Sequence, residues 1–303
     1  MTMTPSQAID VVNQVFGRHA GFRALHAKGL VCTGSFTPSP EGGELTRAAH
    51  MRGGELPATF RFSNGAGDPH HADWLPDPRG MAVKLYLPDG ARTDIVAVSS
   101  PRFPVKTPEG FIELVHAQAP GRRAPFRLAR VLIRHPEAVR NLPVLAPTLL
   151  PRTSYAGITY YGIHAFKWID ATGAERYVRY TLVPESTAEK LSPRAAKRRD
   201  PDYLRQELHQ RLIAGPVHFT LELQIANSGD PVDDPSAAWP KDRRRVNAGR
   251  LQVTGLDTDR ERGDDVLVFD PTRVIDGIEL SNDPVLRFRG PAYSESVARR
   301  MGS

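Results

Sequence analysis

One short run in the sequence combines residue types that bind transition metals. Residues 70–73 read HHAD, which places two histidines beside a carboxylate, and imidazole and carboxylate groups are common ligands of first-row metals. Adjacent histidines point in different directions on a strand or a helix. The flanking aspartates and prolines are typical of a turn, so the sequence favours a turn over a dedicated metal site.

Two other patterns would suit phosphate or nucleic-acid binding. FSNGAGDP at 62–69 contains a GxG, but no helix pattern follows it and no GK[ST] completes a phosphate loop. The basic clusters KRR at 197–199 and RRR at 243–245 lie among aspartates and prolines, without interleaved aromatic residues. We interpret the first as a turn and the clusters as solvated loops, and we expect no nucleic-acid partner.

Two further stretches place polar side chains at regular spacing. GFRALHAKGL contains Arg23 and His26, three residues apart, just before a predicted strand. RFRGPAYSESVARR contains Arg289 and, at i, i+3 and i+7 on one helical face, Tyr293, Ser296 and Arg300. An ordinary surface helix would show the same spacing. The residues alone therefore leave open whether these stretches form a functional site or an ordinary surface.

The composition is that of a globular chain with one large core. The 303 residues are 40% hydrophobic and 24% charged, which excludes disorder, collagen and low complexity. The net charge of +6 favours polyanions or anionic cofactors without naming either. The single cysteine, Cys32, excludes an intramolecular disulfide and a cysteine-based metal cluster, and it argues against thiol redox chemistry.

The sequence also bears on location. The N-terminal residues lack the basic start and continuous apolar stretch of a secretory signal, so we expect a cytoplasmic protein. No window approaches the roughly 18 consecutive apolar residues of a membrane-spanning helix. We therefore expect no membrane partner.

Strand and helix patterns alternate along the chain. Apolar spacing predicts a leading helix over residues 5–20 that stops at Gly21. Thr107, Pro108 and Glu109 are typical of a helix start. Turns are predicted at Asp89–Gly90 and at Thr172–Gly173. Further helices are predicted over 124–134, 201–213 and 291–300, and strand-like runs over 30–37, 58–64, 80–87, 93–100, 157–170, 176–183, 216–226 and 249–256.

About eight strand candidates suggest an antiparallel barrel, because closure removes exposed edges and leaves a wall for a ligand. With the helices, this is an α+β arrangement. No linker or repeat divides the chain, so we expect one domain over residues 1–303. It would comprise a leading helix in 1–20, a barrel with helical insertions in 21–290 and a last helix in 291–303.

Taken in order, seven motifs resemble the heme-binding core of the catalase family. Their order and approximate spacing are those of the family over about 270 residues. The resemblance implies an eight-stranded antiparallel barrel with heme b buried against its wall. The matching motifs are RALHAKG at 23–29, FRFSNGAGD at 60–68, DPRGMAVKLY at 77–86, TDIVAVSSPRFPVKTPEGF at 93–111, YYGIHAFKW at 160–168, AWPKD at 238–242 and FDPTRVIDGIELSNDPVLRFRGPAY at 269–293.

The resemblance also implies roles for four residues. His26 resembles the distal histidine, which takes a proton from the near oxygen of bound peroxide and returns it to the far oxygen. Ser63 matches the serine that hydrogen-bonds and orients this histidine. Tyr293 resembles the proximal tyrosine that ligates the heme iron. Arg289 matches the arginine that favours the phenolate form of that tyrosine.

Other positions match residues that hold the heme or line its surroundings. Forked guanidinium donors suit carboxylates, and the arginines matching those that pair with the heme propionates are Arg23, Arg61 and Arg300. Phe103 and Phe111 match distal phenylalanines that pack near the heme and exclude water. Asp77 matches the acid of the access channel. Ordinary core or turn roles remain the alternative for these last three.

The chain departs from the family at two distal positions. Val98 stands where catalases carry an asparagine, and valine cannot donate a hydrogen bond to peroxide or oxygen. Ser99 or Ser100 would substitute in part if the backbone turned one toward the heme. Gly65 stands where catalases carry a valine, and we expect it to widen the channel for organic donors or hydroperoxides.

The expected activity is that of a short catalase-related peroxidase, which reduces hydrogen peroxide or organic hydroperoxides with small organic donors and has weak catalase activity. The N-terminal arm and C-terminal region of larger catalases are absent from the sequence, so we expect no bound NADPH and a small homo-oligomer. Allene oxide synthases carry threonine before the distal histidine, where this chain has Leu25, which makes hydroperoxide rearrangement a lesser alternative. A non-enzymatic heme-binding barrel is the other.

Overall fold

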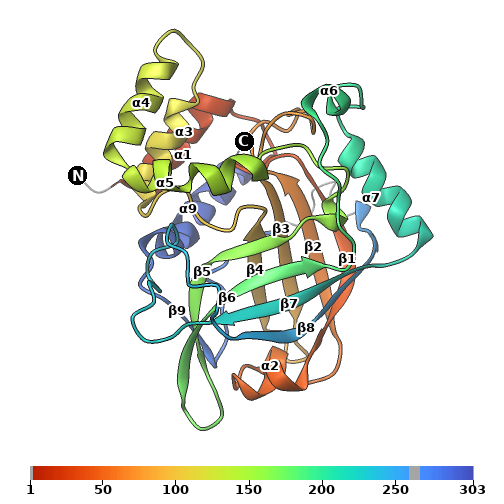
Figure 1. Ribbon diagram of the computed structural model, residues 1–303. Coiled ribbons are helices and arrows are strands. Elements are labelled where there is room, and N and C mark those ends of the chain that lie inside the picture. The colour runs from red at the N-terminus through yellow and green to blue at the C-terminus, as the bar shows by residue number, and fades with distance from the viewer. Residues whose placement is uncertain (1–2, 259–266, 303) are drawn as a thin grey trace.

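Eight long antiparallel strands close into a barrel in the computed structural model, which describes residues 3–258 and 267–302 (Figure 1). The sheet order is β4-β3-β2-β1-β8-β7-β6-β5-β9, and a β4–β5 pairing at Val98 and Tyr161 closes it. The closed barrel confirms the predicted architecture. The strands are β1 Gly29–Pro38, β2 Leu56–Asn64, β3 Arg79–Tyr86, β4 Arg92–Val98, β5 Tyr160–Ile169, β6 Glu175–Pro184, β7 Val217–Ile225, β8 Arg245–Leu256 and the short β9 Ile278–Leu280.

Tight turns join neighbouring strands where they were predicted. Between β3 and β4, Gly90 has φ of +85°, a left-handed conformation that favours glycine, and the Leu87 amide donates to the Ala91 carbonyl at 2.9 Å. Gly173 has φ of +88° in the turn between β5 and β6. These turns confirm the predicted hairpins.

Alternation along the strands separates the barrel interior from its outer face. On β2, Phe60 and Phe62 are fully buried, and Phe62 packs within 6.1 Å of the Tyr160 and Phe219 ring centroids. The alternate residue Ser63 instead lines a cavity beside the barrel. Because aromatic side chains fill the interior, the space for a ligand lies outside the wall.

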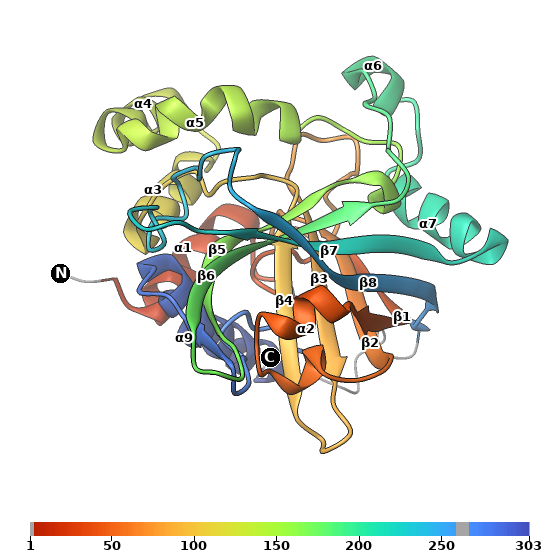
Figure 2. The ribbon, with the colours of Figure 1, turned by 60° about the horizontal axis from the view of Figure 1, so that its bottom comes forward.

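Helices α1, α3 and α9 lie near one another on one side of the barrel, and α6 and α7 lie on the opposite side (Figures 1 and 2). The α3 and α4 bounds confirm the predictions, and α7 begins two residues after its predicted start. The sequence patterns did not predict α2, α5 or α6 as separate helices. The helices are α1 Pro5–Phe16, α2 Pro40–Glu44, α3 Pro108–Ala117, α4 Ala124–Arg134, α5 Pro136–Leu145, α6 Pro193–Ala196, α7 Tyr203–Ala214 and α9 Pro284–Met301, with 3-10 turns at Ala49–Met51, Ala146–Thr148 and Tyr155–Gly157.

Two predicted helix boundaries were wrong. The leading helix ends at Phe16, because Gly17 adopts φ of +87° and terminates it before residue 20. The last helix begins at Pro284, because the Asp283 carboxylate accepts hydrogen bonds from the Val285 and Leu286 amides. Pro291, the predicted start, lies inside this helix. The predicted boundary at residue 291 therefore divides α9.

The helices of the described chain include none with the length and apolar character needed to cross a bilayer. This agrees with the sequence, which contains no comparable apolar window.

A buried ion pair ties the segment before α9 to the barrel. Lys84 on β3 donates from Nζ to Oδ1 of Asp94 on β4 at 2.5 Å, and both residues are buried. Asp94 Oδ2 accepts from the Asp270 amide at 2.9 Å and from Arg273 Nη1 at 2.8 Å. Burial raises the pKa of Asp94 and lowers that of Lys84, while their mutual attraction opposes both shifts.

Asp94→Asn should lower the free energy of unfolding by about 3–5 kcal/mol, because it leaves the Lys84 ammonium buried without its partner. Urea denaturation followed by circular dichroism measures the loss. Asp276→Asn is the matched control, since the Asp276 side chain is 79% exposed and pairs with Arg47 at the surface. Equal effects of the two substitutions would contradict this account of Asp94.

Candidate active site

A cavity lies between the outer wall of the barrel and helices α1, α3 and α9. It contains about 1410 Å³ of space when its open mouth is included. Strands β3 and β4 line the cavity with small residues, which are Gly80, Ala82, Val96 and Val98. Among the described lining residues there is no aspartate or glutamate.

His26 faces this cavity from a strained stretch of backbone just before β1. Its φ of +54° is the only positive value among the described non-glycine residues, and such conformations persist where surrounding contacts hold them. The His26 amide donates to the Gly65 carbonyl at 3.0 Å, and the His26 carbonyl accepts from Arg61 Nη2 at 2.8 Å. Contacts to β2 and its following loop thus hold the histidine in place.

The His26 ring is oriented by Ser63, as the resemblance implied. Its Nδ1 lies 3.0 Å from Ser63 Oγ, which leaves Nε2 as the ring nitrogen for chemistry. Burial, together with the nearby Arg61 and Arg289 guanidinium groups, lowers the pKa of His26 to about 3. The imidazole is therefore neutral near pH 7 and able to accept a proton.

Strand register determines how closely the barrel wall approaches His26. Gly29, Ser63, Gly80 and Val98 occupy one row across β1, β2, β3 and β4. A Cβ atom on Gly80 would lie 2.8 Å from both His26 Nδ1 and Ser63 Oγ. Only glycine at this position leaves room for the contact between His26 and Ser63.

On α9, Arg289 binds the Tyr293 hydroxyl through two nitrogens. Arg289 Nε donates to it at 2.9 Å, and Nη2 donates to the same oxygen. Two donors from a guanidinium stabilise negative charge on that oxygen. The structure thus brings together the tyrosine and arginine that the sequence placed four residues apart.

His164 and Asp283 extend this contact, and the sequence analysis did not assign either one. Arg289 Nη1 lies 3.0 Å from His164 Nε2, and His164 Nδ1 lies 2.6 Å from Asp283 Oδ2. Because a guanidinium only donates, Nε2 accepts and the ring proton lies on Nδ1, which donates to Asp283. Burial lowers the pKa of His164, which favours this neutral form. The YGIHAFKW motif contained His164, but its function depends on a residue 119 positions away.

The three predicted carboxylate-binding arginines all line the cavity. Burial first, and then the charges of Arg61 and Arg300, lower the pKa of Arg23. Arg23 Nη2 donates to the Leu267 carbonyl at 2.5 Å, and Arg61 also holds the His26 backbone. Like charges around an acid-free cavity would be stabilised by an anionic ligand.

Phe103, Phe111 and Val98 all line the cavity. The Phe103 and Phe111 rings pack with centroids 4.9 Å apart. Ser99 and Ser100 do not line it. Ser99 Oγ accepts from the Arg79 amide, and Ser100 Oγ contacts Thr148, so neither takes the place of the missing asparagine beside Val98.

Gly65 and Asp77 are absent from the described lining residues. A Cβ atom on Gly65 would meet Pro78 Cγ at 2.7 Å and Asp77 Oδ1 at 2.9 Å, so the space that a side chain would take is already occupied. This position does not support the expected widening. Asp77 Oδ2 accepts from the Ala66 amide at 3.0 Å, and burial raises the pKa of Asp77. Here Asp77 holds the loop after β2.

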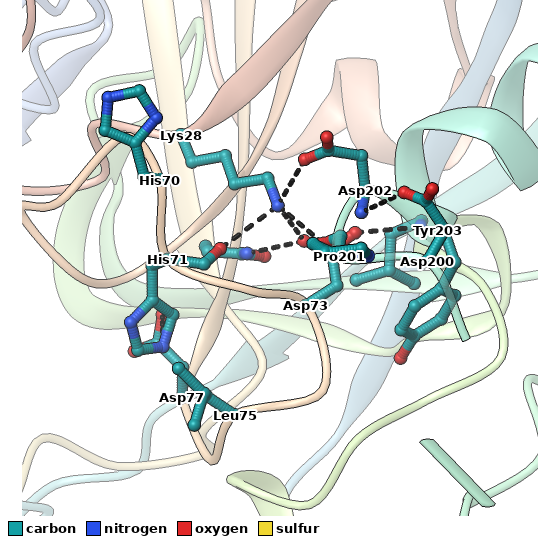
Figure 3. A network of polar contacts seen from close by, with 12 residues as sticks. Lys28, His70, His71, Asp73, Leu75, Asp77, Asp200, Pro201, Asp202 and Tyr203 are labelled. Atoms are coloured by element: carbon teal, nitrogen blue, oxygen red, sulfur yellow. Dashed lines mark hydrogen bonds and ion pairs between the residues drawn. The ribbon is translucent and has the colours of Figure 1, made fainter. Parts of the chain in front are cut away.

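The HHAD run is a turn that anchors α7 (Figure 3). The buried Asp73 carboxylate accepts from Lys28 Nζ at 2.9 Å and from the Leu204 amide at 2.9 Å. Lys28 Nζ also contacts the Asp202 carboxylate and the His71 carbonyl. Residues 3–258 and 267–302 contain no cluster of metal-ligating side chains.

In the second basic cluster, at 243–245, the arginines pair with Asp230, Glu41 and Glu222.

Comparison with solved structures defines the class of fold. Catalase A from Saccharomyces cerevisiae superposes with a TM-score of 0.84 at 23% identity, covering 94% of this chain and 62% of that one. A fungal catalase superposes with a TM-score of 0.83 at 23% identity, covering 94% and 60%. The fold is thus that of catalases, and this chain spans about three fifths of their length.

Sequence comparison gives the family. The Catalase family model matches residues 4–303, and the chain belongs to the catalase family. A catalase-related peroxidase of Mycolicibacterium paratuberculosis is 48% identical over 99% of this chain and 96% of that protein. A catalase-related peroxidase of Synechococcus elongatus is 32% identical, over 98% and 89%. A catalase of Latilactobacillus sakei is 28% identical, over 93% of this chain and 62% of that protein.

Gly80→Ala should displace the His26 ring from Ser63, because the new methyl group would overlap both side chains. We expect the free energy of unfolding to fall by about 1–3 kcal/mol and the His26 NMR resonances to shift. Gly53→Ala is the control, since a Cβ atom there has nothing within 4 Å. Unchanged His26 resonances in Gly80→Ala would contradict this packing argument.

Proposed function

We propose that this chain is a heme peroxidase that reduces hydrogen peroxide or organic hydroperoxides with small organic electron donors. The observation that carries the proposal is one cavity lined by a neutral histidine, an arginine-bound tyrosine and three further arginines, without an acidic residue among the described lining. The catalase-related peroxidases at 48% and 32% identity support the same reaction class.

The residues present fit heme b as the cofactor. Tyr293 would ligate the iron through its phenolate oxygen, and Arg23, Arg61 and Arg300 would pair with the two propionate carboxylates. The small outer-face residues of β3 and β4 leave space along the wall. When bound, the heme supplies the redox chemistry, because its iron exchanges electrons with peroxide and with donors.

His26 moves a proton between the two peroxide oxygens. The neutral ring would accept a proton at Nε2 from one oxygen and return it to the other, which leaves as water or an alcohol. Overall, ROOH takes up two electrons and two protons and yields ROH and water. Ser63 holds the ring at Nδ1, so Nε2 keeps its direction while the proton moves.

Arg289 keeps Tyr293 ready to ligate iron. Its two hydrogen bonds stabilise the phenolate oxygen, while His164 and Asp283 hold the guanidinium in place. Asp283 also caps α9, so one carboxylate positions both the helix and the arginine.

Val98 favours peroxidation over dismutation. It lines the cavity in the same strand row as Ser63 and Gly80, and its side chain offers no hydrogen bond to a second peroxide or to oxygen.

A heme-binding barrel without turnover is the second candidate function, because Val98 changes this side of the cavity. The cytoplasmic location, the absence of NADPH and a small homo-oligomer stay predictions.

Tyr293→Phe and His26→Ala test the proposed function together. The purified protein should show heme absorption that Tyr293→Phe abolishes or alters. Tyr161→Phe, at a position outside the described cavity lining, should leave that absorption unchanged.

His26→Ala should keep the heme but slow donor oxidation by about 10²-fold or more. The wild-type rate constant should stay flat from about pH 5 to 8, because His26 remains neutral there.

Two outcomes would overturn this proposal. A protein that neither contains heme nor takes it up would exclude a heme enzyme. Heme binding without a rate that depends on His26 would instead assign the chain to the class of heme carriers.

Val98→Asn should raise oxygen evolution relative to donor oxidation by about three- to tenfold, which corresponds to one added net hydrogen bond. The ratio is measured with an oxygen electrode and a chromogenic donor at one peroxide concentration. Val96→Asn is the matched control, because Val96 lines the same cavity two residues earlier on β4. If both variants raised the ratio equally, the distal asparagine would not explain the difference.

A further inference from the structure

Helices α4 and α5 carry an apolar surface that faces solvent. Six of the nine large hydrophobic side chains exposed in the described chain lie between residues 126 and 150. Phe126 is 77% exposed and Ile133 is 81% exposed, the two highest values among these nine side chains. The six residues are Phe126, Leu128, Ile133, Val139, Leu142 and Leu150, and together we name them the α4–α5 surface.

This surface is also strongly basic. Residues 119–150 contain one acid, Glu137, which is buried. The same segment contains Arg122, Arg123, Arg127, Arg130, Arg134 and Arg140. Of these, Arg134 pairs with Glu113 of α3, and Arg127 donates to the Ala119 carbonyl. Arg122 and Arg130 have no acidic partner among the residues that the structure describes, so their charges face solvent.

The helical spacing on α4 places its arginines beside an apolar stripe. Phe126, Ala129 and Ile133 recur at i, i+3 and i+7 and are all exposed. Within α4, Arg127, Arg130 and Arg134 lie along one side of that stripe in the helical projection, and Arg122 lies just before the helix begins. The one buried residue of α4, Val131, lies away from the stripe. The apolar stripe of this helix therefore points outward, the reverse of a helix that packs its apolar face on a core.

The position of the surface leaves it open to a large partner. The two helices lie at the periphery of the molecule, away from the barrel (Figures 1 and 2). α4 packs on α3, whose other side contributes Pro108, Phe111 and Ile112 to the cavity lining. One helix layer thus separates the α4–α5 surface from the cavity.

We propose that the α4–α5 surface docks on the headgroup region of an anionic lipid bilayer. An outward apolar stripe bordered by arginines matches helices that lie in the plane of a membrane interface, with aromatic and aliphatic residues inserted and cations at the phosphates. A symmetric contact with a second copy would bring two arginine-rich surfaces together. Nucleic acid would leave Phe126 and Ile133 without apolar partners. This proposal departs from the expectation of no membrane partner, which rested on the lack of a spanning helix, because a peripheral contact needs none.

The test measures binding of the purified protein to vesicles. Vesicles of phosphatidylcholine mixed with phosphatidylglycerol should co-sediment the protein, and vesicles of phosphatidylcholine alone should bind it much more weakly. Phe126→Ser combined with Ile133→Ser should reduce partitioning into anionic vesicles by about tenfold or more. Arg122→Gln combined with Arg130→Gln should do the same and reduce the salt dependence of binding.

Matched controls come from elsewhere on the surface. Ile213→Ser removes an isoleucine that is 67% exposed on α7, and Arg194→Gln combined with Arg198→Gln removes two exposed charges near α6. Neither should change partitioning. Because all substituted residues are exposed, we expect every variant to fold. Circular dichroism checks this.

Three results would overturn the proposal. One is equal binding to both kinds of vesicle, and another is equal loss in the control variants. The third is that the vesicles bind no protein, while the α4 substitutions abolish a dimer or an RNA complex instead. The readout is binding rather than turnover, so failure here and failure of the proposed reaction are distinguishable.

Discussion

The alternation of side chains across the closed barrel wall is the constraint on which the site depends. On β2, Phe60 and Phe62 fill the interior, while Arg61 and Ser63 face the cavity. A slip of one residue in register would exchange these two sets. Register also aligns Gly29, Ser63, Gly80 and Val98 in one row across four strands. The filled interior therefore places the ligand space outside the wall, and the row determines what lines it.

The two halves of the site are held by different kinds of contact. His26 depends on backbone geometry, because its left-handed conformation is maintained by the Gly65 carbonyl and the Arg61 guanidinium. Tyr293 depends on a chain of side chains, in which Asp283 orients His164 and His164 accepts from Arg289. Because α9 begins at Pro284, Tyr293 lies well inside a continuous helix rather than in its first turn.

The distribution of charge is consistent with the use of each surface. The described cavity lining has arginines and no acids, which favours a dicarboxylate cofactor. On the outside, the segment 119–150 combines six arginines with the exposed apolar residues of the α4–α5 surface, which favours an anionic interface. The excess of basic residues thus falls into separate regions, whereas the arginines of the basic cluster at 243–245 pair with Asp230, Glu41 and Glu222.

The sequence by itself determined the strands and the hairpin turns, because period-2 patterns and turn glycines are local signals. The candidate site residues His26, Ser63, Arg289 and Tyr293 came from the resemblance of continuous motifs to those of a known family. Tertiary structure decided which neighbouring residues reach the cavity. Gly65, Asp77, Ser99 and Ser100 lie beside site residues in sequence, yet strand register and backbone hydrogen bonds turn them away. It also decided where α9 begins and which residue holds Arg289, because the contact between Asp283 and His164 joins positions 119 residues apart. No local pattern encodes a contact at that distance, since only folding of the barrel brings β5 and α9 together.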